Sequence, residues 1–155
     1  MDTIGRMRSL WRSLSEIPGG RRVFSAFVGR AAPYTGTFGP RVIDVRPGFA
    51  AVEMLDRKPV RNHLRSIHAI ALANLSEATS GLAFTFGLPP ESRAIVTGLS
   101  IEYHKKARGT LRAECHCAIP EDNRESSYRV EVETRDGNGD LVSSAIVNWL
   151  VGPRR

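Results

Sequence analysis

Glu77 is the residue of this sequence whose type and surroundings most clearly favour chemistry. Alanines and leucines precede and follow it along the chain. Burial among such neighbours disfavours the charged form, so we expect the pKa of the Glu77 carboxyl to be raised toward neutrality. A carboxyl in that state can act as a general base on water or as a nucleophile toward a carbonyl carbon. The alternative is a helix carboxylate that faces solvent.

The start of the same segment offers a complementary group. If a helix begins near His68, the backbone N–H groups of Ala69 and Ile70 have no partner within the helix and can bind a developing oxyanion. Nine residues separate His68 from Glu77, which corresponds to about 13.5 Å of rise and about half a turn. Glu77 therefore cannot act on a carbonyl held at the start of its own helix. The spacing predicts a site shared by two chains.

Two polar residues, Asn74 and Ser80, lie three positions before and after Glu77 and share its helix face. They could orient the carboxylate or a water molecule, or they could form a polar seam between packed elements. The sequence leaves both interpretations open.

Cys115 and Cys117 flank His116, an arrangement that invites a metal interpretation. A structural zinc site needs four ligands, and no second ligand pair exists. We expect no metal and two core thiols on one face of a strand.

The elements that must position these residues begin with helices. Apolar residues recur at helical spacing from Ile4 to Ile17, and Pro18-Gly19-Gly20 ends that helix. A second helical pattern covers residues 23–28, and residues 32–40 read as a loop. We place a helical arm at residues 1–34 and the main domain at residues 35–155. The apolar stripe predicts packing on this domain or on a partner subunit, and contact with a membrane is not expected.

In the main domain, apolar residues recur with a period of two in the segments before and after one long helix. Residues 41–46 and 49–55 predict a hairpin, and the segment from Ser66 to Phe86 predicts a helix that is apolar nearly all round. Such a helix must be covered on most sides, which a curved sheet wrapped around it achieves. Four strands follow, in residues 95–103, 111–119, 128–135 and 141–151. In the first of them, one face is predicted to carry Ile95, Thr97, Leu99, Ile101 and Tyr103.

Composition excludes several classes of protein. The chain has 155 residues, a net charge of +6 and 41% hydrophobic residues, which fits one soluble globular domain. No apolar run reaches the length of about 18 residues that a membrane span requires. The basic residues look scattered and no aromatic-rich strand resembles an RNA-recognition motif, so a nucleic-acid partner is not expected. Free thiols and the lack of a secretory signal predict a cytoplasmic protein.

The order of elements predicts an α+β hotdog fold, in which an antiparallel sheet wraps around a long central helix. The segment from Asn62 to Glu77 resembles the active-site segment of the phenylacetyl-CoA-type hotdog thioesterases, with Asn62, His68 and Glu77 at matching positions. An uncharacterised bacterial branch of that superfamily is similar over nearly the whole chain. The matching residues are Trp11, Pro18-Gly19-Gly20, Asn62-His63, the run from Ala73 to Glu77, Ser80-Gly81 and the run from Glu102 to Arg108.

This resemblance implies an acyl-CoA thioesterase that works as a homodimer or a dimer of dimers, with water as co-substrate and no cofactor. It implies that Asn62 holds the substrate carbonyl or the water and that His68 helps to position the thioester. Asn62 could instead be a turn residue, and His68 could instead be a structural residue near the helix cap. Coenzyme A phosphates would lie near Lys105, Lys106 and Arg108, unless these form a solvated turn.

One departure from the resemblance concerns the helix start. The chain has Ala69-Ile70 where active thioesterases of this type commonly have Gly-Gly. A branched side chain at Ile70 narrows the approach to the backbone amide. The alternative function is therefore a hotdog protein that binds acyl-CoA or a fatty acyl group without turnover.

Overall fold

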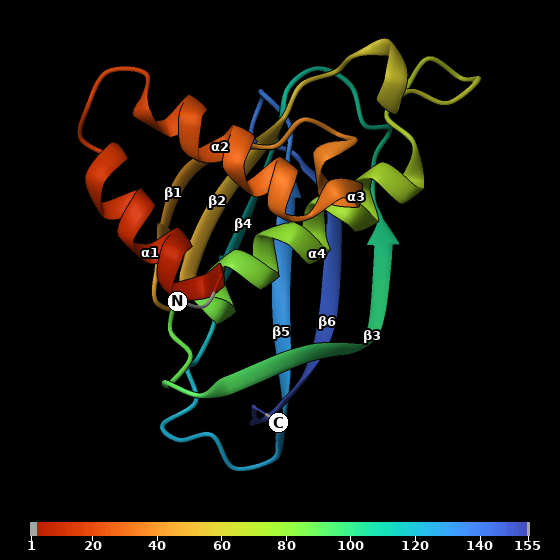
Figure 1. Ribbon diagram of the computed structural model, residues 1–155. Helices are drawn as coiled ribbons and strands as arrows, with labels where there is room; N and C mark the ends of the chain where they lie inside the picture. The colour runs from red at the N-terminus through yellow and green to blue at the C-terminus, as the bar shows by residue number, and fades with distance from the viewer. Residues whose placement is uncertain (1–2, 155) are drawn as a thin grey trace.

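The computed structural model describes residues 3–154 as helices packed on one antiparallel sheet (Figure 1). The helices are α1 (Thr3–Leu14), α2 (Gly20–Ala31), α3 (Pro33–Gly36), the 3-10 helix η1 (Lys58–Val60) and α4 (Ala69–Thr85). The strands are β1 (Arg41–Arg46), β2 (Phe49–Met54), β3 (Ser92–Tyr103), β4 (Leu111–His116), β5 (Ser126–Arg135) and β6 (Leu141–Pro153). The predicted succession of hairpin, long helix and four strands is confirmed.

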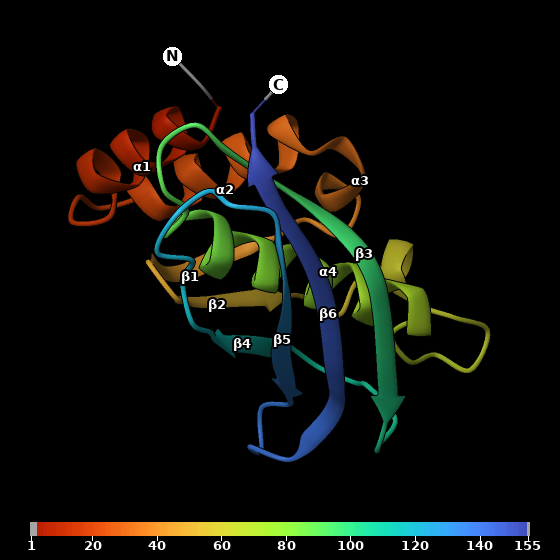
Figure 2. The same cartoon turned by 90° about the horizontal axis from the view of Figure 1, so that it is seen from below.

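The six strands are arranged in the order β1-β2-β4-β5-β6-β3, and all neighbours are antiparallel. Strands β1 and β3 are therefore the two edges of the sheet. Figure 2 shows that the sheet curves around α4. This is the wrapped-helix arrangement that the sequence predicts.

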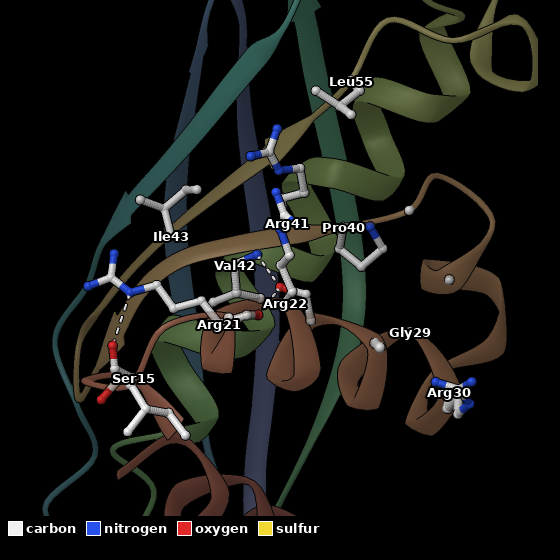
Figure 3. A pocket seen from close by; sticks show the side chains of 16 residues that line it. Ser15, Arg21, Arg22, Gly29, Arg30, Pro40, Arg41, Val42, Ile43 and Leu55 are labelled. Atoms are coloured by element: carbon white, nitrogen blue, oxygen red, sulfur yellow. Dashed lines mark hydrogen bonds between the residues drawn. The ribbon is translucent and has the colours of Figure 1, made fainter. Parts of the chain in front are cut away.

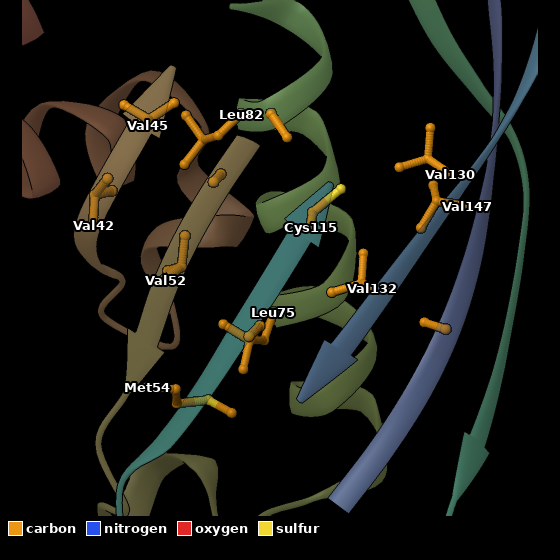
Figure 4. Close-up of a cluster of buried hydrophobic side chains, with 14 of the residues drawn as sticks. Val42, Val45, Val52, Met54, Leu75, Leu82, Cys115, Val130, Val132 and Val147 are labelled. Carbon is orange, nitrogen blue, oxygen red and sulfur yellow. The ribbon is translucent and has the colours of Figure 1, made fainter. Parts of the chain in front are cut away.

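Helix α4 is apolar on most sides because it is covered from two directions. It lies between the sheet and a layer formed by α1, α2 and α3 (Figure 2). Leu75 and Leu82 of α4 belong to the same buried cluster as Val52 of β2 and Val132 of β5 (Figure 4). Each such side chain contributes about 1.5–3 kcal/mol when it is removed from water. The observed helix falls inside the segment predicted from the sequence.

The N-terminal helices pack on this domain. The partly buried apolar residues of α1 contact the main core, and the Trp11 ring meets the fully buried Phe24 ring of α2 edge-on, with centroids 4.9 Å apart. The prediction that the arm packs on its own domain is confirmed. The core is continuous across residue 34, where the sequence suggests a boundary between arm and domain.

The segment at residues 32–40 contains the short helix α3, which the sequence analysis placed in a loop. Pro33 occupies the first turn of α3, where its fixed φ suits a helix. Helices α2 and α3 approach closely at Gly29 and Gly36. A Cβ added to Gly36 would lie 2.4 Å from the Gly29 carbonyl oxygen, so this close approach requires glycine.

Strand β3 corrects one prediction about side-chain direction. Its pairing with β6 shifts by one residue between Val96 and Gly98, so that Ile95 lies opposite Leu150 and Leu99 lies opposite Val147. Leu150 lies three positions after Val147 on β6, and an odd spacing along a strand puts two side chains on opposite faces. Their partners Ile95 and Leu99 are therefore on opposite faces as well. The single face predicted for alternate residues from Ile95 to Tyr103 is therefore wrong. Buried partners on β6 place one set on the concave face, toward α4: Leu99, Ile101 and Tyr103.

The two cysteines are free thiols at the end of β4. Cys115 is buried and Cys117 is half-buried, and the hydrogen bond between them, together with burial, raises the pKa of Cys115. The residues described by the structure contain no cluster of His, Cys, Asp and Glu that could hold a metal ion.

No helix within residues 3–154 has the length and apolar character of a membrane span.

Candidate functional site

The N-terminus of α4 is capped by His68. Its Nδ1 atom accepts a hydrogen bond from the Ile70 backbone N–H at 3.0 Å, and the His68 backbone N–H donates to the Val60 carbonyl. One of the two amides expected to bind an oxyanion is therefore engaged by the ring. Ala69 N–H forms no hydrogen bond of this kind among the described residues, which leaves it as the better placed donor.

Asn62 lies in the tight loop that leads to this helix. Its Oδ1 atom accepts hydrogen bonds from Leu64 N–H at 2.9 Å and from the N–H and hydroxyl of Ser66, both at 3.2 Å. The side-chain oxygen is thus used to close the loop, as expected of a turn residue. This geometry favours the structural interpretation of Asn62 over a direct contact with substrate.

A small cavity of about 190 Å³ lies beside the helix start. His68, Ile70 and Asn74 line it on the α4 side, and Tyr34 and Phe38 line it on the side of α3 and the loop that follows. The structure therefore brings three of the predicted residues together at one end of α4. Glu77 does not line this cavity.

Glu77 lies farther along α4 on a stripe that stays partly accessible. Ile70 is exposed, and Ala73, Glu77 and Gly81 are half-buried, at spacings of three and four residues. Burial raises the pKa of the Glu77 carboxyl, as the apolar sequence around it predicts. Within residues 3–154, no side chain forms a hydrogen bond or ion pair with this carboxylate.

The stripe runs beside β3 and β6. At the helix start, the Tyr103 hydroxyl donates a hydrogen bond to the Ala69 carbonyl at 3.0 Å. Toward the other end, the Trp149 ring faces Gly81, where an added Cβ would lie 3.5 Å from it. Tyr103 is a residue that the site prediction missed, although the resemblance includes it in the run from Glu102 to Arg108. Its burial raises the pKa of the phenol, so the hydroxyl stays protonated at neutral pH.

Asn74 and Ser80 make hydrogen bonds away from the Glu77 carboxylate. Asn74 Nδ2 donates to the Tyr34 carbonyl at 3.1 Å, and the Ser80 hydroxyl donates to the Glu77 backbone carbonyl at 2.9 Å. The Trp149 indole N–H donates to Ser80 Oγ at 3.3 Å. These contacts favour the polar-seam interpretation, because both side chains connect α4 to neighbouring elements.

The predicted phosphate cluster divides into two parts. Lys105 Nζ lies 2.6 Å from a carboxylate oxygen of Asp136 and 2.6 Å from one of Asp140, at the β5–β6 turn. Its charge is already compensated, so Lys105 is poorly suited to the predicted role. Lys106 and Arg108 are exposed and form no ion pair within the described residues.

The raised pKa of Glu77 predicts a pH-dependent stability difference. Both folded and unfolded chains hold a protonated Glu77 below the unfolded pKa of about 4.3. Above that pH, ionisation of Glu77 begins in the unfolded chain while the folded chain stays protonated. The free energy of unfolding therefore falls as the pH rises from the unfolded pKa through the folded pKa. The variant Glu77→Gln cannot ionise and should therefore gain melting temperature relative to the native chain between pH 4 and pH 8. Thermal melts across that range measure the difference, and a constant offset would contradict the buried, charge-disfavouring environment.

Solved structures share this architecture. The structural-genomics protein APC5556 aligns with a TM-score of 0.82 and 28% identity, over 98% of this chain and 99% of that chain. A Pseudomonas aeruginosa protein of unknown function, named a probable thioesterase, aligns with a TM-score of 0.76 and 18% identity, over 89% of this chain and 97% of that chain. A thioesterase family protein from Silicibacter pomeroyi aligns with a TM-score of 0.72 and 11% identity, over 88% of this chain and 99% of that chain.

These alignments confirm the α+β hotdog fold, because they cover between 88% and 98% of this chain. No curated protein matches the chain. Residues 20–151 match the family described as a domain of unknown function, DUF4442, and the match begins in α2 and ends in β6. The chain thus belongs to the DUF4442 family and has the hotdog fold that solved thioesterases share.

Proposed function

We propose that this protein hydrolyses the thioester of an acyl-CoA and acts as a homodimer or a dimer of dimers. The observation that carries this proposal is the half-buried Glu77 carboxyl, which lies on the accessible stripe of α4, has a raised pKa and has no side-chain partner within residues 3–154. A raised pKa makes the carboxylate a stronger base toward water. Several structural neighbours are named thioesterases, which supports the same chemistry.

The need for two chains follows from the geometry of α4. Glu77 and the helix N-terminus lie on one rigid helix, separated by about 13.5 Å of rise. Strand β3 is an edge strand of 12 residues and presents Leu99 and Tyr103, both partly exposed, beside the stripe. Pairing of this edge with the same edge of a second copy would cover these residues and place each Glu77 near the partner's helix start.

The reaction balances with water as the co-substrate. Glu77 takes a proton from water while the water oxygen forms a bond to the thioester carbonyl carbon. The developing oxyanion lies near Ala69 N–H of the other chain. The C–S bond then breaks, the thiolate of coenzyme A takes up the proton held by Glu77, and a free carboxylic acid leaves. Lys106 and Arg108, which form no ion pair within residues 3–154, are the residues proposed to contact the phosphates of coenzyme A.

A thiol-release assay over a panel of acyl-CoAs with short, long and aromatic acyl groups tests this function. We expect saturable turnover of at least one member, with formation of free carboxylic acid in equal amount. Absence of turnover across the panel by a folded dimer would contradict the enzyme proposal.

The second candidate function is binding of acyl-CoA without turnover. Ile70 favours it, since its side chain is 55% exposed at the helix start and its own N–H is already donated to His68. A substrate carbonyl must pass this branched side chain to reach the backbone amide. Saturable binding of acyl-CoA without thiol release would support this function.

Ile70→Gly separates the two functions. Ile70 is exposed, so its removal leaves no internal cavity, and the expected loss of stability is about 1 kcal/mol for glycine in a helix. If Ile70 blocks the amide, the variant should hydrolyse acyl-CoA with a higher kcat/KM than the native chain. If the native site is already competent, looser positioning should lower kcat/KM. Sedimentation of both proteins serves as the control for dimer content.

A further inference from the structure

A large cavity of the described structure lies outside the site at α4. It is a groove of about 970 Å³ between α2 and β1 (Figure 3). The volume falls within the range of about 300–1,000 Å³ that is typical of small-molecule sites. The groove floor is closed by Ser25, whose hydroxyl oxygen accepts a hydrogen bond from Val42 N–H at 2.8 Å.

The walls of this groove carry positive charge that is only weakly compensated. Arg21, Arg22, Arg30 and Arg41 line it, and its lining residues include no Asp or Glu. Figure 3 shows Arg22 and Arg41 in the middle of the groove and Arg21 at one end. Within the described residues, Arg22 and Arg30 form no ion pair. The nearest carboxylate oxygen to Arg41 belongs to Glu53, at 3.9 Å.

The distribution of charge along the chain strengthens this observation. Residues 1–43 contain seven arginines and two acidic residues, whereas residues 44–155 contain 15 basic and 14 acidic residues. Nearly all of the net charge of +6 therefore belongs to the N-terminal helices and the start of β1. A concave surface with one sign of charge concentrates counter-ions of the opposite sign.

The groove also has an apolar part. Its accessible apolar lining consists of the half-buried Ile43 and Leu55 and the exposed Ala26, whereas Pro40 and Val42 of the lining are buried. Arginine head groups beside an apolar strip suit a ligand with an anionic head and a hydrocarbon chain. Guanidinium groups bind carboxylates and phosphates through paired, charge-assisted hydrogen bonds.

We propose that the groove between α2 and β1 is a second binding site, distinct from the site at α4, for a single-chain amphiphile with a carboxylate or phosphate head group. Arg22 and Arg41 bind the head group, and the chain lies along Ile43 and Ala26. The proposal does not depend on hydrolysis at Glu77.

Titration calorimetry with dodecyl phosphate and dodecanoate, below their micelle concentrations, tests this site on the full chain. We expect saturable binding of one molecule per chain, and no comparable binding of inorganic phosphate or of decyl maltoside. The double variant Arg22→Gln/Arg41→Gln should weaken binding at least tenfold. Ala26→Phe, which keeps every charge but fills the groove, should weaken it by a similar factor.

Arg12→Gln is the matched control, because it removes one positive charge from the same helical layer outside the groove. We expect its affinity to change less than twofold. An equal loss in Arg12→Gln, or undiminished binding in the double variant and in Ala26→Phe, would overturn the proposal. Binding only to vesicles that contain anionic phospholipid would also overturn it and indicate a membrane surface instead. Binding of the amphiphile should persist in Glu77→Gln. A loss of thioester hydrolysis at the α4 site can therefore be distinguished from a loss of binding in the groove between α2 and β1.

Discussion

Glu77→Gln is expected to lower kcat for the best acyl-CoA substrate at least about 100-fold, the loss typical of a missing general base. The substitution keeps the shape of the side chain and removes its ability to accept a proton. No described side chain forms a hydrogen bond with the carboxylate, so little else should change in the fold. Steady-state thiol release measures the effect, and circular dichroism and sedimentation check folding and assembly.

Glu121→Gln is a suitable control for this variant, because Glu121 is an exposed carboxylate in the loop between β4 and β5. It removes the same charge and should leave kcat unchanged. Native turnover in a dimeric Glu77→Gln protein would show that the base lies elsewhere. If both variants lost activity equally, the effect would come from net charge and not from the site.

Leu99→Asp is expected to convert a dimer of about 34 kDa into a monomer of about 17 kDa and to reduce thioester hydrolysis at least about 100-fold. Leu99 is 37% exposed on the concave face of the edge strand β3, although its cross-strand partner Val147 is fully buried. A carboxylate there would be buried without a partner if two β3 edges met. Loss of the dimer would separate Glu77 from the helix start of the other chain.

The bulge in β3 supplies the matched control. Ile95→Asp introduces the same charge on the same strand, on the face that points away from α4, where Ile95 is 48% exposed. This variant should remain a dimer and keep its activity. Sedimentation velocity measures the oligomeric state of both variants, and thiol release measures their activity. A native chain that sediments as an active monomer would rule out the composite site.

Much of the fold could be predicted because it depends on local patterns. The alanine-rich segment must form a helix, its apolar surface must be covered, and the period-two segments on either side supply the covering sheet. The burial of Glu77 follows in the same way, since an apolar helix must be covered on most sides, and this burial raises the pKa of its carboxyl. These expectations rest on patterns within short segments of the sequence.

The tertiary structure decided what depends on contacts between distant segments. The sequence cannot show that Lys105 meets Asp136, 31 residues away, or that the Tyr103 hydroxyl binds the Ala69 carbonyl. The groove of arginines was also not predicted, because the basic residues look scattered along the sequence. A count of charges by segment would have revealed their concentration in residues 1–43.

The sequence by itself determined the type and order of the elements, the wrapped central helix and the buried character of Glu77. Only the tertiary structure decided the face of each β3 side chain, the partner of Ile70 N–H and the cavity between α2 and β1. Helix formation depends mainly on neighbouring residues, and a helix that is apolar nearly all round has to be covered by the rest of the fold. Strand register depends on the partner strand, and one extra residue at Thr97 moves Ile95 to the opposite face from Leu99 without any change in the apolar pattern.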